Sequence, residues 1–298
     1  MIPYVRQLKV DYGACDQVSP LIRRVTANNP SAFTFLGTGT YIIGRGEVAV
    51  IDPGPDMPDH LEAILRAVEG ERVSDILITH HHMDHSPLAA PLKAVTGATI
   101  HGCALADEAE RDTGDVVMEA ADDGAFRPDN SLCGGGTVSG PGWSLEAIAT
   151  PGHTSNHLSY ALAEENACFT GDHIMGWSTT VVAPPDGDMT DYLASLAAIA
   201  ARGFDTLWPT HGPPVREVAP FLAAYAEHRQ ERIDQILGAL QAGPGRINDL
   251  VPRLYADVNP GLWPAAARSM LAAMIHLGRE GRIAVDGPAG PDSTYRLV

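Results

Sequence analysis

The octapeptide THHHMDHS, which follows the apolar run DILI, carries four imidazoles and one carboxylate. Such groups are ligands for divalent metal ions, and loops after strands are the usual place to hold them. His80 and His82 are two residues apart, so an extended backbone puts both on one side, while His81 points away and is expected to be exposed. Asp84 and His85 follow where the chain should turn, and they can aim at a second point nearby. The spacing therefore favours a metal centre over a polar surface turn, and one loop can serve two ions.

Four further metal-ligand candidates lie on other predicted turns. Each follows an apolar, strand-like run and adjoins Gly or Pro: His153 in TPGHTSNH, Asp172 in FTGDHI, His211 in PTHGPP and Asp52 in IDPG. A sandwich of sheets presents such loops along one edge. We therefore expect these side chains to meet the histidine cluster. For Asp52 the alternative is a residue that closes a β-turn before Pro53.

Strand and helix patterns alternate around these residues. Two strands are expected at Thr38–Gly46 and Glu47–Gly54 with a hairpin turn between them, then a helix over Asp59–Gly70 and a strand over Asp75–Ile78. A helix and a short strand follow the histidine cluster, and the stretch from Trp143 to Ile174 supplies three more strands. This alternation predicts an α/β sandwich.

The second half of the chain changes in character twice. The segment from Asp107 to Gly142 is Gly-rich, acidic and weakly periodic, so we expect an irregular rim of the active site or an extended loop. From Glu217 onward, three helical patterns are followed by two small strands, GRIAV and STYRLV. Three helices and a two-stranded wing are typical of a winged-helix domain. We therefore expect a catalytic domain over residues 1–222 and a small helical, winged-helix-like domain over residues 223–298.

The bulk composition is that of a globular chain. Of 298 residues, 45% are hydrophobic, which is ordinary for a buried core. The start MIPYVRQLKV lacks the apolar region of a secretory signal, and no stretch approaches the roughly 20 apolar residues that cross a bilayer. The four cysteines are widely spaced, which favours free thiols in a reducing compartment over disulfides. We therefore expect a cytoplasmic protein that does not bind membranes.

The charge balance argues against nucleic-acid binding by the C-terminal helices. The formal net charge of −17 offers no basic footprint for tight, sequence-blind binding. From Arg229 to the end there are eight arginines, no lysine and seven acidic residues, a balance of +1, so sequence-specific DNA binding is not expected. The helices are expected instead to close one wall of the cleft beside the metal edge. Arg229 and Arg232, one helical turn apart, are expected to brace the contact between the domains or to hold a phosphate.

The series HxHxDH, His, Asp, His resembles, in order and spacing, the metal-ligand signature of the metallo-β-lactamase superfamily. The matching residues are His80, His82, Asp84, His85, His153, Asp172 and His211. The resemblance implies an αββα sandwich with two divalent ions at one edge, zinc in most members. Manganese or iron are alternatives, because His and Asp ligands suit them as well. By the same resemblance, one ion is bound by His80, His82 and His153, and the other by Asp84, His85 and His211.

The resemblance also implies roles for residues around the ligands. Asp172 would bridge the two ions, and Asp52 matches a carboxylate that orients a ligand histidine by accepting its other N–H. His157 and Thr180 are weaker candidates, for substrate contact or support of the ligands. His173 departs from the usual pattern beside the bridging aspartate, and its alternative role is a structural hydrogen bond.

The expected function is hydrolysis. Two ions lower the pKa of a bridging water towards about 7, which creates a strong nucleophile at neutral pH, and Asp84 could shuttle the proton afterwards. The substrate would be an ester, lactone, thioester or phosphodiester in a small molecule or in single-stranded RNA. Which of these is cleaved, and the oligomeric state, stay open, because selectivity depends on rim loops.

Two alternatives follow from similar families. Nearly the whole chain is similar to the β-lactamase-like protein 2 branch, whose animal members are mitochondrial endoribonucleases acting on single-stranded RNA. The persulfide dioxygenases share the HxHxDH signature but use a single iron, although the long tail argues against this oxidoreductase class. A binding protein without catalysis is disfavoured, because no ligand position is missing.

Overall fold

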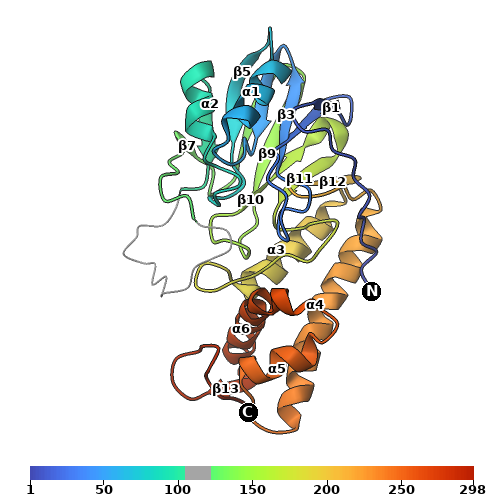
Figure 1. Ribbon diagram of the computed structural model, residues 1–298, viewed down its shortest axis with the longest axis vertical. Coiled ribbons are helices and arrows are strands. Elements are labelled where there is room, and N and C mark those ends of the chain that lie inside the picture. The colour runs from blue at the N-terminus through green and yellow to red at the C-terminus, as the bar shows by residue number, and fades with distance from the viewer. Residues whose placement is uncertain (105–121) are drawn as a thin grey trace.

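The computed structural model describes residues 1–104 and 122–298, and Figure 1 shows two stacked sheets above a lobe of helices. The first sheet contains seven strands in chain order. They are β1 (Cys15–Gln17), β2 (Ile22–Thr26), β3 (Gly39–Arg45), β4 (Glu47–Ile51), β5 (Arg72–Leu77), β6 (Thr99–Gly102) and β7 (Asn130–Ser131). Strands β1 to β4 pair antiparallel, and β4 to β7 pair parallel. The predicted hairpin is confirmed, because β3 and β4 pair around Gly46, whose φ of 73° suits glycine.

The second sheet has five strands in the order β12, β11, β10, β9, β8. They are β8 (Gly136–Gly140), β9 (Trp143–Ala149), β10 (Leu158–Leu162), β11 (Ala167–Gly171) and β12 (Thr206–Pro209), with the 3₁₀ turn η2 (Ala163–Glu165) after β10. Neighbours are antiparallel except β11 and β12. Strand β8 corrects the expectation of an irregular segment at Asp107–Gly142, because Val138 is buried in the core between the sheets. Residues 107–121 of that segment lie outside the described residues.

Helices cover the outer face of each sheet. α1 (Pro58–Ala67) and α2 (Ala89–Thr96) share a buried cluster with the first sheet. α3 (Met189–Arg202) and the start of α4 (Val218–Gln241) share another with the second sheet. The core between the sheets is aromatic and contains Tyr41, Trp143, Tyr160, Phe169 and Trp208. The predicted αββα sandwich is therefore confirmed.

Helix α4 continues from the sandwich into the C-terminal lobe (Figure 1). Phe221 and Tyr225 belong to the sandwich core, whereas Ile233 and Leu240 belong to the core of the lobe. The lobe adds α5 (Ile247–Leu254), η3 (Pro260–Leu262), α6 (Trp263–Arg279), and the antiparallel pair β13 (Ile283–Val285) and β14 (Tyr295–Leu297). The expected three helices and wing are thus present. The expected division between residues 222 and 223 falls inside α4 and stays a prediction.

Two of the four cysteines are joined in the structure. Cys103 and Cys133 form a disulfide, which corrects the expectation of free thiols. Because β6 pairs with β7, two residues 30 positions apart reach a Cα–Cα distance of 4.6 Å, which their spacing alone does not reveal. Cys15 and Cys168 are free.

Within residues 1–104 and 122–298, no helix combines the length and the apolar character needed to cross a bilayer.

Strands of both sheets end along one edge of the sandwich. β4 and β11 end one residue before Asp52 and Asp172, and β5, β9 and β12 end two to four residues before His80, His153 and His211. Hydrogen-bonded ladders fix where each strand ends, so the loops that follow hold their side chains in place. The sheets therefore position the residues that the sequence singles out.

His60 on α1 gives the fold a pH dependence that can be measured. It is buried, and its Nε2 lies 2.8 Å from the hydroxyl of Thr40. Burial lowers the pKa of His60 to about 4 from an ordinary 6.5. Between these values the unfolded chain binds a proton that the folded chain does not, so the free energy of unfolding falls by about 3 kcal/mol as the pH drops. Urea titrations across this pH range should show that the free energy of unfolding depends less steeply on pH in His60→Gln than in the unaltered protein. An unchanged pH dependence in the variant would contradict this assignment.

Candidate metal centre

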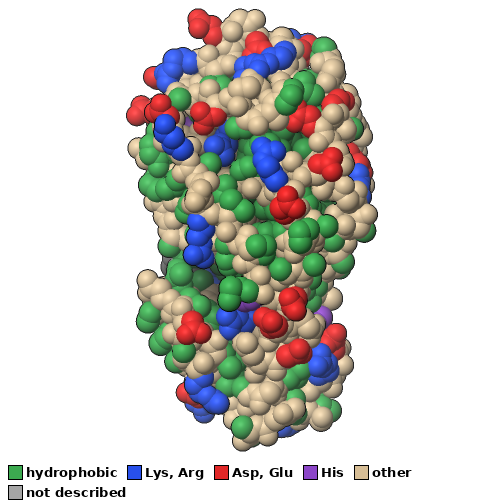
Figure 2. Space-filling model, turned by 90° about the vertical axis from the view of Figure 1, so that its right-hand side faces the viewer, with side chains coloured by type: hydrophobic (Ala, Val, Ile, Leu, Met, Phe, Trp, Pro, Cys, Tyr) green, Lys and Arg blue, Asp and Glu red, His purple; other side chains and the backbone are tan. Residues whose placement is uncertain are grey.

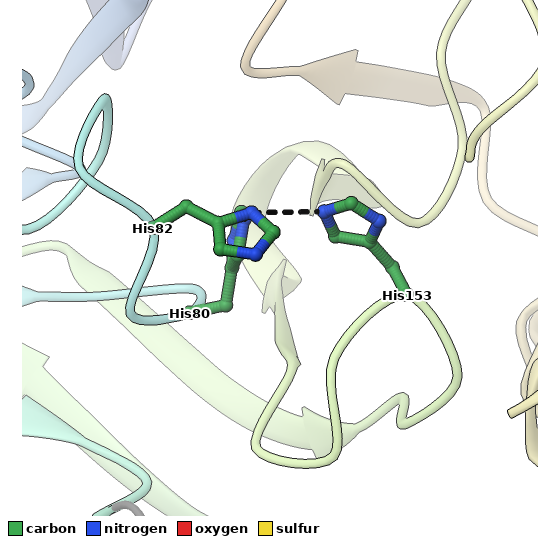
Figure 3. Close-up of side chains that lie close together, drawn as sticks. All are labelled: His80, His82 and His153. Carbon is green, nitrogen blue, oxygen red and sulfur yellow. Dashed lines mark hydrogen bonds between the residues drawn. The ribbon is translucent and has the colours of Figure 1, made fainter. Parts of the chain in front are cut away.

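Three histidines direct ring nitrogens toward one point at the edge of the sandwich. His80 and His82 follow β5, and His153 lies on the turn after β9. Nε2 of His80 lies 2.9 Å from Nδ1 of His82, and Nε2 of His153 lies 3.2 Å from the same atom (Figure 3). The three donor atoms lie within 4.8 Å of one another. A single ion could therefore contact all three.

Asp84, His85 and His211 form a second group beside the first. Nε2 of His211 lies 3.1 Å from Oδ2 of Asp84, and Nε2 of His85 lies 3.6 Å from Oδ1 of Asp84. Both histidines are buried, whereas the side chain of Asp84 is 21% exposed. These donor atoms also lie within 4.8 Å of one another, so they could hold a second ion.

Asp172 lies between the two groups. Its Oδ1 is 3.4 Å from Nε2 of His211 and 3.6 Å from Nε2 of His85. Its Oδ2 is 3.8 Å from Nε2 of His153, in the first group. One carboxylate thus faces both groups, which is the arrangement that a bridging ligand requires.

The second ring nitrogen of several histidines is anchored to the surrounding loops. The partners are the Thr79 hydroxyl for His80, the Val181 carbonyl for His153 and the Gly37 carbonyl for His211, at 3.0, 2.8 and 3.4 Å. In each case Nδ1 faces the partner, so that Nε2 is the ring nitrogen that faces the centre. These contacts hold the three rings in one orientation.

Asp52 is the hydrogen-bonding hub behind the second group. Its fully buried carboxylate accepts from the main-chain N–H and the hydroxyl of Thr79, both at 2.8 Å, and from the hydroxyl of Thr210 at 2.9 Å. It also lies 2.9 Å from Nδ1 of His85. One side chain therefore ties the loops after β4, β5 and β12 together and orients a histidine, as the resemblance implies.

The electrostatics differ between the two groups. Burial, reinforced by neighbouring imidazoles, lowers the pKa of His80 well below 6.5 and that of His82 to about 3. Burial also opposes a charge on His85, but the carboxylates, Asp84 first, outweigh it and raise its pKa well above the ordinary value. For Asp172, burial favours the neutral acid, but the nearby imidazoles outweigh it and hold its pKa well below the usual range. The first group is thus neutral imidazole, and the second contains ionised carboxylates.

The residues present fit a pair of divalent ions. Among the seven donor residues, four buried atoms have no hydrogen-bond partner within the described part of the chain: Oδ1 of Asp84, Nε2 of His85, Oδ1 of Asp172 and Nε2 of His211. Buried polar atoms are rarely unpaired in native proteins, so such a cluster indicates a further partner. The first group brings three ring nitrogens within 4.8 Å of one another, an arrangement that suits a shared cation. Imidazole and carboxylate are the donor set of zinc, and manganese and iron accept it as well.

Two of the weaker candidates support the turn that carries Asp172. Nε2 of His157 accepts from the main-chain N–H of Asp172 at 3.2 Å, and the hydroxyl of Thr180 donates to its main-chain carbonyl at 2.6 Å. His173 is fully buried against the ring of Tyr192, with centroids 4.6 Å apart. The structural hydrogen bond considered for His173 is absent, since neither ring nitrogen has a partner among the described residues.

His81 corrects one expectation, because it is fully buried. It does point away from the first group, but other loops cover that side. Its Nδ1 lies 2.8 Å from Oδ1 of Asn156, and its Nε2 lies 3.0 Å from Oδ1 of Asp122. Thr79 and Thr210 are supporting residues that the sequence analysis missed. Their signal is a Thr directly before a histidine at a strand end, in ITH and PTH.

A cavity of about 470 Å³ opens onto both groups. Its lining includes Asp84, Asp172 and His211 at the metal edge, and residues of α4 and α6 from the C-terminal lobe. Figure 2 shows hydrophobic side chains gathered around the hollow at the waist of the molecule. The volume lies in the usual range for small-molecule sites. The lobe thus forms one wall of the cleft, as expected.

Comparisons with known proteins agree with this geometry. The profile of the Metallo-beta-lactamase superfamily matches residues 34–211, and that of the Beta-lactamase associated winged helix domain matches residues 247–290. The Beta-lactamase-like protein 2 homolog of Drosophila melanogaster is 30% identical over 285 residues, which cover 93% of this chain and 94% of the relative. The Atrochrysone carboxyl ACP thioesterase of Aspergillus fumigatus is 32% identical over 237 residues, which cover 78% of this chain and 68% of the relative.

A solved structure supports the fold over the whole length. The beta-lactamase domain protein from Burkholderia ambifaria superposes with a TM-score of 0.78 at 18% identity, covering 100% of this chain and 97% of that one. The superfamily usually binds divalent metals, and the two donor groups described above could bind them. The chain therefore belongs to the metallo-beta-lactamase superfamily, as a metallo-beta-lactamase-fold hydrolase with a C-terminal winged helix domain.

Proposed function

We propose that the protein hydrolyses a small ester or thioester with a binuclear, zinc-type centre. The observation that carries the proposal is the convergence of seven donors in two groups with Asp172 between them. One ion would be held by His80, His82 and His153, and the other by Asp84, His85 and His211. Bound there, divalent ions would act as Lewis acids and lower the pKa of a coordinated water to about 7.

The chain's own residues prepare the site for this chemistry. The anchored imidazoles need no reorganisation during the reaction, which favours stabilisation of a developing charge. Asp84 lines the cavity and is partly exposed, so its carboxylate can take the proton of the attacking water and return it to the leaving group. The apolar cavity walls exclude bulk water from the reacting carbonyl.

The cavity favours a compact carbonyl substrate. Its volume of about 470 Å³ suits a drug-sized molecule, and the C-terminal lobe closes one side. The formal net charge of −17 gives no broad basic surface for a polyanion. The similarity to a protein named as a thioesterase adds support for a thioester.

A substrate panel tests the proposal. Zinc-loaded protein would be assayed with a thioester, a lactone, a cephalosporin and labelled single-stranded RNA, beside Asp84→Ala. We expect hydrolysis of the thioester or the lactone, and a loss of roughly 10²–10⁴-fold in the variant, because the proton carrier and an ion ligand are removed together. Cleavage of no carbonyl substrate, or equal rates in the variant, would refute the proposal.

The second candidate function is cleavage of single-stranded RNA. It is favoured by the similarity, over 93% of the chain, to a Beta-lactamase-like protein 2 homolog, the branch for which the sequence resemblance implies this activity. Metal ions would supply positive charge in an otherwise acidic protein. Cleavage of the RNA with the carbonyl substrates left intact would favour this function over the first.

A further inference from the structure

The cavity contains cationic groups that the metal centre does not use. Apart from Asp84 and Asp172, none of its described lining residues carries a carboxylate. Four arginines line it: Arg6, Arg229, Arg232 and Arg268. A chain with a formal net charge of −17 thus gathers guanidinium groups around one cavity. Charges of one sign beside low-dielectric walls attract ligands of the opposite sign.

Arg229 on α4 is a buried cation close to the metal edge. It is 7% exposed, and its guanidinium lies 4.7 Å from the ring centroid of Tyr192 and 5.7 Å from that of Tyr225. One Nη donates to the carbonyl of Thr180 at 2.6 Å, and Thr180 in turn holds the main chain of Asp172. Arg229 therefore braces the lobe against the sandwich, as expected.

The charge of Arg229 is not neutralised by that brace. Its Nε has no hydrogen-bond partner, and no carboxylate among the described residues pairs with it. A buried cation normally has an ionic partner, because taking its charge out of water costs several kcal/mol. Arg229 lines the cavity, so the missing partner could enter there.

Arg232 lies one helical turn further along α4 and also lines the cavity. Its guanidinium lies 4.5 Å from the ring centroid of Tyr255, and its Nη1 donates to the carbonyl of Leu254 at 2.7 Å. No described carboxylate pairs with it either. Like charges three residues apart on a helix destabilise each other. Burial and then these two arginines lower the pKa of the adjacent His228 to about 4, which agrees with a positive potential.

Apolar side chains line much of the remaining cavity, including Phe33, Trp177, Ile233, Ile236 and Leu262. Figure 2 shows Lys or Arg side chains at the rim of the hollow whose surroundings are hydrophobic. The cavity therefore offers metal donors at the edge of the sandwich, guanidinium groups on α4, and apolar walls. A ligand that satisfies all of these has a carbonyl, an apolar body and an anionic group.

We propose that Arg229 and Arg232 bind an oxyanion of the substrate, so that the cavity selects an amphipathic ester or thioester carrying a carboxylate or a phosphate. The assignment of the scissile carbonyl to the metal edge rests on the proposed function. The assignment of the oxyanion site depends only on the two arginines of α4. An oxyanion between the two guanidinium groups would offset their positive charge, one unit for a carboxylate and up to two for a phosphate, and would accept hydrogen bonds from their free N–H groups. The apolar walls would then cover the body of the substrate.

Binding of a fluorescent fatty acid tests the site without relying on hydrolysis. Zinc-loaded, full-length protein would be titrated with a dansylated long-chain carboxylate and with its primary amide, which keeps the apolar body. We expect the carboxylate to bind roughly ten-fold more tightly or better, since hydrogen bonds to charged groups are the stronger ones. Competition by decyl phosphate or by decanoate shows which oxyanion is preferred.

Variants of Arg232 locate the oxyanion. Arg232→Gln keeps the aliphatic stem but should abolish the preference for the carboxylate, and Arg232→Lys should restore part of it. Arg282→Gln removes an exposed arginine that does not line the cavity and should leave the preference intact. Equal affinity of the carboxylate and the amide for the unaltered protein would refute the proposal. A preference retained in full in Arg232→Gln would also refute it, because the carboxylate would then be bound without a contribution from Arg232.

Two further outcomes separate this inference from the proposed function. Displacement of the probe by a single-stranded RNA oligonucleotide, but not by decyl phosphate, would overturn the inference and assign the arginines to RNA. Matched thioesters with a neutral or a phosphorylated leaving group would be compared in the hydrolysis assay. If the protein prefers the carboxylate probe but hydrolyses neither thioester, the proposed function is refuted and this inference is not. If it hydrolyses both thioesters at equal kcat/KM and binds the carboxylate and the amide equally well, this inference is refuted and the proposed function is not.

Discussion

Replacing Asp172 by Ala is expected to lower kcat/KM by roughly 10³-fold or more and to cost the protein one of two bound ions. The reason is its place between the donor groups, with Oδ1 facing His85 and His211 and Oδ2 facing His153. Loss of a group that merely supports a ligand typically costs 10–100-fold in metal affinity or activity, so loss of a shared ligand should cost more. Steady-state kinetics and elemental analysis of the variant would measure both effects.

A matched control is available on the same domain. Asp205 is an exposed aspartate next to β12, so Asp205→Ala should keep the full activity and metal content. Thermal unfolding of both variants would establish that they are folded. An Asp172→Ala protein that keeps two ions and at least half of the activity would contradict the bridging role.

Replacing Asp52 by Ala is expected to destabilise the fold by about 3–5 kcal/mol and to weaken metal binding by roughly 10–100-fold. The carboxylate is fully buried and serves Thr79, Thr210 and His85, so its removal leaves several buried donors without an acceptor. Urea unfolding would measure the loss of stability, and competition with a chelator would measure metal affinity. If Asp52→Ala does not fold, Asp52→Asn, which keeps the volume and one acceptor oxygen, should show the same effects at a smaller size.

Asp75 provides the comparison for Asp52. It is paired with His101 at 2.8 Å across β5 and β6 of the first sheet, and it is not among the donor groups. Asp75→Ala should therefore lower stability by about 1–3 kcal/mol without changing metal affinity. Equal metal affinity in Asp52→Ala and Asp75→Ala would show that Asp52 does not contribute to metal binding.

The elements that carry periodic or alternating patterns could be predicted from the sequence. The hairpin around Gly46 and the long α4 follow from local signals, namely glycine at a positive φ and apolar residues at helical spacing. The metal donors could be found because each lies on a turn that follows an apolar run. Their grouping around two points came from the resemblance to a family, since spacing along the chain does not fix distances across two sheets.

Features that depend on packing between distant segments could not be predicted. Cys103 meets Cys133 because β6 and β7 pair, and His81 is buried because Asn156 and Asp122 cover its side of the loop. The guanidinium of Arg229 lies in the cavity because α4 packs against the turn that carries Thr180. In each case the partner lies far away in the sequence, so no local pattern reports it.

Metal analysis of protein purified without added metal tests whether the centre is binuclear. We expect two zinc ions per chain, bound by donors in two groups, with the content reduced to about one ion in Asp172→Ala. A single iron ion per chain with no second metal would contradict it and favour a mononuclear oxygenase. Protein that is folded, takes up no divalent ion on exposure to zinc and keeps its activity would contradict it outright.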